Sequence, residues 1–129
     1  MELIADQTEG FSHTALKYWA LITEWGAYEN KGEVMPEERV KRLMEVRDEL
    51  FHAYKNLTVV EARLHLLGAV ESQRLCREYG ELVTRFTKTA WLGGTPLTEK
   101  AGQQWRADIL GCRERFFQSL SKMYVGEDA

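Results

Sequence analysis

The sequence is short of the residues that most often carry chemistry or break helices. Its 129 residues include two cysteines, two prolines and three histidines. Two cysteines are too few for a disulfide scaffold, and we expect Cys76 and Cys112 to be reduced, semi-buried thiols. No long run alternates apolar and polar residues, so the sequence predicts no β-strand. The few prolines leave room for long uninterrupted helices.

Long apolar runs are also missing. The longest apolar cluster, ALKYWALI at residues 15–22, is too short and too interrupted to cross a bilayer. The segment MELIADQTEG has neither a basic start nor an apolar run, so we expect a cytoplasmic protein without a secretory leader or membrane insertion. The formal charge of −3 weakly repels nucleic acid and acidic membranes, and binding to either would need a local basic patch.

The remaining composition is that of one globular domain, which we expect to span residues 1–129. The hydrophobic fraction of 44% and the charged fraction of 29% exclude disordered and collagen-like chains. Four segments carry the apolar spacing of helices, at about residues 4–28 (or 12–28), 36–67, 69–90 and 96–124. Joined by short connections, they predict an all-α fold, an antiparallel bundle of four main helices.

Prolines and glycines mark the expected helix ends. Pro36 and Pro96 are placed as first helical residues, and Thr95 as the N-cap of the last helix. Gly68 is placed as the C-terminal cap of the second helix.

The long second helix carries a heptad pattern. Leu43, Leu50, Leu57 and Leu64 are seven apart, and Val46, Ala53, Val60 and Leu67 fill the second apolar position of each heptad. Such a row is typical of a coiled coil, but an internal helix of a bundle packs with the same period. The pattern therefore favours packing inside the chain over a zipper between chains, and it leaves both open.

Two further apolar groups suggest a surface for a partner. A second apolar group of the second helix is displaced from its leucine row: Val40, Met44, Phe51 and Tyr54. In the last helix Leu110, Phe117 and Tyr124 are seven apart and lie away from its main apolar stripe. Parts of these groups can be covered by the first helix, which is rich in aromatic residues. We expect the uncovered parts to form an interface.

No motif for catalysis or for a cofactor is present. Glu49 and His52 share the spacing of some helical metal sites, but a di-iron bundle needs this motif twice, and no second Glu-x-x-His occurs. A nucleophile elbow and a phosphate-binding loop are also absent from the sequence. We therefore expect no enzyme, no cofactor and no metal, and a metal-binding bundle is the weakest alternative.

A basic row on the third helix is the basis of another alternative. The row consists of Arg74, Arg77, Arg85 and Lys88. Such a row could follow a phosphate backbone, which would make the protein a small helical subunit of a nucleic-acid-handling complex. The neighbouring Glu78 and Glu81 favour a solvated face with intrahelical ion pairs instead.

The segment ARLHLLGAVESQRLCREYGELV, residues 62–83, resembles a pattern in small uncharacterised bacterial helical proteins. Arg113, Phe116 and the turn FFQSLSKMY are similar to a later helix of the same proteins. The resemblance covers roughly the last two thirds of the chain, while the aromatic first helix and the lack of a neighbouring membrane segment depart from it. It implies a helical hairpin and no particular activity.

Together these observations predict a non-catalytic protein–protein interaction module. We expect it to associate with itself through an apolar helix face, and to serve as a scaffold, an adaptor or an inhibitor of another protein.

Overall fold

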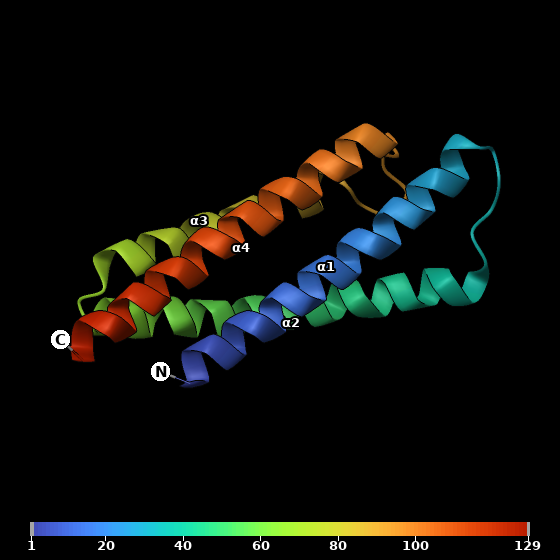
Figure 1. Cartoon of the computed structure of the whole chain (residues 1–129). Helices are drawn as coiled ribbons and strands as arrows, with labels where there is room; N and C mark the ends of the chain where they lie inside the picture. The colour runs from blue at the N-terminus through green and yellow to red at the C-terminus, as the bar shows by residue number, and fades with distance from the viewer. Residues whose placement is uncertain (1, 129) are drawn as a thin grey trace.

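Four α-helices account for most of the chain. They are α1 (Glu2–Asn30), α2 (Glu37–Leu66), α3 (Val70–Thr89) and α4 (Glu99–Asp128). The computed structural model describes residues 2–128, with the side chains of residues 4–123. Neighbouring helices run in opposite directions, and both termini lie toward the same end as the α2–α3 turn (Figure 1). The predicted antiparallel bundle of four helices is confirmed.

The bundle consists of two helical hairpins. α1 packs most closely on α2, and α3 packs most closely on α4. Contacts of α2 with α3 and of α1 with α4 join the hairpins. α3 has 20 residues and α2 has 30, so α3 cannot cover α2 along its whole length.

The leucine row of α2 lies inside the bundle. Seven of its eight positions are buried: Leu43, Val46, Leu50, Ala53, Leu57, Val60 and Leu64. They belong to one core with the inward side chains of the other helices. The heptad pattern therefore reflects packing within the chain, which is the interpretation that the sequence favoured.

The eighth position, Leu67, departs from the pattern. Its side chain is 58% exposed, because α2 ends at Leu66 and Leu67 is the C-cap residue. The chain then turns at Gly68, whose φ of 70° suits glycine, as predicted for this cap.

The aromatic side chains of α1 fill the centre of the bundle. The ring of Phe11 meets Tyr54 and Tyr79 edge to face, with centroids 5.2 and 5.3 Å away. Two buried hydrogen bonds also join α1 to α3 and to the residue that follows it. Ser12 Oγ and Tyr79 Oη share a hydrogen bond of 2.7 Å, and Tyr18 donates to the carbonyl of Ala90 at 2.6 Å. These bonds satisfy polar groups that would otherwise be costly to bury.

The predicted start of the last helix is wrong by three residues. α4 begins at Glu99, and Thr98 Oγ1 accepts a hydrogen bond of 3.1 Å from the amide of Ala101, as an N-cap residue does. The preceding segment is held across α1 instead. The carbonyl of Leu97 accepts a bond from Asn30 at 3.0 Å, and a Cβ at Gly26 would lie 3.5 Å from the Leu97 backbone. Pro96 therefore stays outside the helix.

Exchanging Leu57 for glutamate should unfold the bundle, because it would bury an unpaired charge among apolar side chains. We expect a loss of about 4 kcal/mol or more of unfolding free energy, measured by urea denaturation followed by far-ultraviolet circular dichroism. Leu66→Glu is the matched control, since Leu66 is 84% exposed on the same helix. Equal stability of the two variants would contradict an internal leucine row.

Removing the cap of α4 should be more harmful at Thr98 than at Thr95. Thr98→Ala should cost about 1 kcal/mol of unfolding free energy, because the Ala101 amide loses its partner. Thr95 is exposed and lies outside the helix, so Thr95→Ala should change stability by less than about 0.5 kcal/mol. If urea denaturation showed a larger loss for Thr95→Ala than for Thr98→Ala, the helix would begin at Pro96, as the sequence predicted.

Candidate interaction surface

A second row of side chains on α2 faces the flank of α3. Its members follow one another at steps of three and four residues: Arg47, Phe51, Tyr54, Thr58 and Glu61. Two hydrogen bonds show which residues of α3 lie beside this row. Thr84 Oγ1 donates to Tyr54 Oη at 3.2 Å, and Arg77 Nε donates to Glu61 Oε1 at 2.8 Å. The two helices are thus aligned from Tyr54 to Glu61.

A groove lies between this row of α2 and the facing side of α3. One end has a volume of about 520 Å³, lined by Leu50, Phe51 and Trp91 among others. The other end, of about 450 Å³, is lined by Leu57 and Gly80 among others. Tyr54, Thr84 and Lys88 line both ends, so the two cavities adjoin. We call this feature the α2–α3 groove.

Two glycines shape the groove. A Cβ at Gly80 would lie 3.1 Å from Cδ2 of Leu57, so glycine lets α3 approach α2 closely there. A Cβ at Gly94 would lie 2.6 Å from Cε2 of Trp91, so glycine lets the indole pack against the turn that follows α3. A side chain at position 94 would therefore displace the indole of Trp91.

The end near Trp91 carries large exposed apolar side chains. Phe51 is 62% exposed and Trp91 is 52% exposed. Met44, two turns before Phe51 on the same flank of α2, is 44% exposed. Because Tyr54 lies beside Thr84 and the two helices are antiparallel, the end of α3 lies beside roughly residue 49 of α2. The first turns of α2 therefore have no part of α3 next to them. We call Met44, Phe51 and Trp91 the apolar patch.

The interface residues predicted from the sequence divide into three groups. Met44 and Phe51 are exposed as expected. Val40, Leu110 and Phe117 are half-buried, and the Arg113 guanidinium lies 4.9 Å from the centre of the Phe117 ring. The side chain of Tyr124 lies outside the described residues. Among the described side chains, the strip on α4 therefore offers less free apolar surface than the flank of α2.

The apolar periodicity of the sequence did not predict Trp91 as part of this surface. Trp91 lies in the connection between α3 and α4, outside any periodic pattern. A large aromatic residue two positions before a Gly-Gly pair was the available signal.

The basic row of α3 is partly neutralised by carboxylates. Arg74 donates to Glu78 at 2.6 Å and also pairs with Glu71. Arg77 pairs with Glu61 across the groove. Arg85 and Lys88 line the groove, and among the described side chains neither makes an ion pair within 4.0 Å.

The groove as a whole carries an excess of positive charge. Its charged lining residues are four cations, Arg47, Arg77, Arg85 and Lys88, and two carboxylates, Glu61 and Glu81. The complete chain, by contrast, has a formal charge of −3. Arg47 has a carboxylate close by, since its guanidinium lies 3.7 Å from Asp48.

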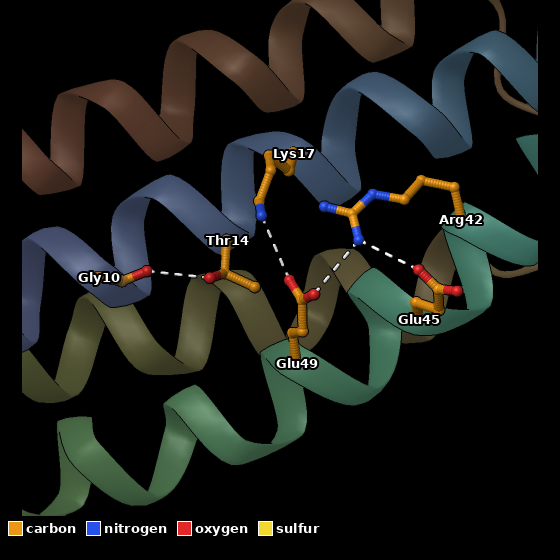
Figure 2. Close-up of polar contacts among 6 residues, drawn as sticks. All are labelled: Gly10, Thr14, Lys17, Arg42, Glu45 and Glu49. Carbon is orange, nitrogen blue, oxygen red and sulfur yellow. Dashed lines mark hydrogen bonds and ion pairs between the residues drawn. The ribbon is translucent and has the colours of Figure 1, made fainter.

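Glu49 of the Glu-x-x-His pair serves a contact between helices. Its carboxylate accepts hydrogen bonds from Lys17 of α1 at 3.2 Å and from Arg42 at 3.3 Å (Figure 2). The hydrogen bond from Lys17 is the main cause that lowers the pKa of this carboxyl group. Among the described residues, no group of three or more His, Cys, Asp and Glu side chains lies close enough to hold a metal ion.

Comparison with protein-family models, curated proteins and solved structures finds no match for this chain. The resemblance to small bacterial helical proteins therefore stays a prediction. Within the described part of the chain, no helix combines the length and the apolar character that a membrane crossing needs.

Cys76, at the floor of the groove, should be unreactive toward thiol reagents in the folded protein. Burial raises the pKa of its thiol to about 12, so almost none is thiolate near pH 8. We expect a chromogenic disulfide reagent at pH 8 to label Cys112, which is half-buried, well before Cys76. Peptide mapping identifies the labelled site, and both should react in denaturant. Rapid labelling of native Cys76 would contradict its burial.

Proposed function

We propose that this protein is a non-catalytic protein–protein interaction module, and that the α2–α3 groove with the apolar patch is its binding surface. The exposure of Phe51 and Trp91 carries this proposal. Among the aromatic residues whose side chains are described, these two alone are exposed, and both line the same cavity. The remaining aromatic rings are buried or half-buried within the bundle.

Exposed aromatic side chains on one face favour a binding role. Single apolar residues are common on protein surfaces, but neighbouring large ones are costly to keep in water. Tryptophan and other aromatic residues also dominate the energetic centres of protein interfaces. In this chain the core already holds many aromatic rings, so Phe51 and Trp91 are not needed to complete it.

Self-association is the form of this proposal that can be tested without a known partner. A zipper through the leucine row would need the bundle to open, because that row is buried in a single chain. Two copies that meet would instead use the apolar patch, which needs no change of fold. We expect this association to be weak and dependent on concentration, because each copy offers only three large exposed apolar side chains there.

The nucleic-acid alternative has less support. Two of its four cations, Arg74 and Arg77, are already paired with carboxylates, and displacing these would reduce the gain from phosphate contacts. A metal-binding bundle is supported by no cluster of ligands among the described residues.

Light scattering on a sizing column tests the proposal. At increasing concentration we expect the mass to rise from that of the 14.9 kDa monomer toward a dimer, with little change between low and high salt. Phe51→Glu should abolish this rise, because a charge in an apolar interface is unfavourable.

A second exposed apolar group provides the control. Leu66, Leu67 and Val70 are exposed at the α2–α3 turn. If Leu66→Glu rather than Phe51→Glu removed the dimer, the binding surface would lie at the turn. A wild-type protein that stays monomeric at all concentrations would exclude self-association.

A further inference from the structure

We infer that the α2–α3 groove binds an amphipathic helix of a partner protein, with acidic side chains along the edges of its apolar face. This inference rests on the proposed function, because it takes the groove to be the binding surface, and it adds the class of partner. Three properties of the groove support it: its shape, its apolar floor and its charge.

The shape of the groove suits a third helix. From Arg77 to Thr89, where α3 ends, the α3 side is roughly 18 Å long at 1.5 Å per residue, the length of about three helical turns. A hollow between two antiparallel helices is the usual place for a helical peptide to bind. If two copies met groove to groove, two concave surfaces would face each other and leave space unfilled between them. A foreign helix therefore fits better than a second copy.

The floor of the groove offers contacts at helical spacing. Phe51 and Trp91 stand at one end, Tyr54 lies in the middle, and Leu57 lies toward the other end beside Gly80. A helix with apolar residues at positions i, i+4 and i+7 would place one side chain at each of these three levels. The exposed rings would supply most of the gain in apolar burial.

The charge of the groove indicates which side chains should flank the apolar face of that helix. Arg47 stands on the α2 side of the aromatic end, and Lys88 stands on the α3 side. Arg85 adds a third cation farther along α3, one turn after the carboxylate of Glu81. The second lining carboxylate, Glu61, is occupied by Arg77, so cations remain in excess. Carboxylates on both edges of an incoming helix would meet cations there. A basic helix would meet repulsion instead, so charge distinguishes the two partners more than it adds affinity.

Two synthetic peptides of about 16 residues test the inference, with the same apolar positions and with either glutamate or lysine on the flanks. Their binding to the full chain is measured by fluorescence anisotropy. We expect the glutamate peptide to bind at least about tenfold more tightly than the lysine peptide, since several charge pairs at the exposed edges of the groove change sign together. Arg47→Glu/Lys88→Glu should remove or reverse this preference. Arg63→Glu/Lys100→Glu, with the same change of net charge at exposed sites outside the groove, should leave it unchanged.

The outcomes separate this inference from the proposed function. If Phe51→Glu abolishes self-association but neither peptide binds, or both bind equally, the acidic helix is excluded and the binding surface stands. If Phe51→Glu affects neither self-association nor peptide binding, both are excluded. Tighter binding of a single-stranded oligonucleotide than of the glutamate peptide, lost in Arg47→Glu/Lys88→Glu, would assign the groove to nucleic acid and overturn the inference.

Discussion

The burial of the leucine row of α2 is the contact on which the rest of the structure depends. α2 is the only helix that packs extensively on both α1 and α3 within the described chain, and its seven buried positions supply one continuous side of the core. Removing apolar surface of this kind from water is the main driving force for such a bundle. Because the row faces inward, only the flanks of α2 are available for contacts outside the core.

The difference in length between α2 and α3 produces the free surface. α3 ends ten residues earlier than a helix as long as α2 would, and the chain then folds back through Trp91 and two glycines. The flank of α2 that carries Met44 and Phe51 therefore stays uncovered, and Trp91 is brought to the same place. On the opposite flank, Glu49 accepts a hydrogen bond from Lys17, which ties α2 to α1, and another from Arg42 of α2 itself (Figure 2). One flank is thus occupied within the chain and the other is available.

Much of the fold could be predicted from the sequence, because periodicity reports burial directly. The leucine row, the inward side of α3 and the cap at Gly68 follow from spacing and from the conformational freedom of glycine. The start of α4 could not be chosen in this way. Thr95 and Thr98 are both suitable cap residues, and the choice depends on the contact of Leu97 with Gly26 and Asn30 of a distant helix.

The candidate site was harder to predict for the same reason. Met44 and Phe51 could be found because they lie beside a periodic row on one helix. Trp91 could not, since its place depends on where α3 ends against α2. The pairing of Arg77 with Glu61 likewise joins two helices, and it changes a basic row into a groove with a smaller excess of positive charge.

Hydroxyl-radical footprinting with mass spectrometry, at low and high protein concentration, tests most directly whether α2 turns its leucine row inward and its flank outward. At low concentration Met44, Phe51 and Trp91 should be oxidised, while Leu50 and Leu57 stay protected. At high concentration protection should spread to Phe51 and Trp91. Oxidation of Leu50 and Leu57 at low concentration, with protection only at high concentration, would contradict this account, because the leucine row would then be an interface between chains.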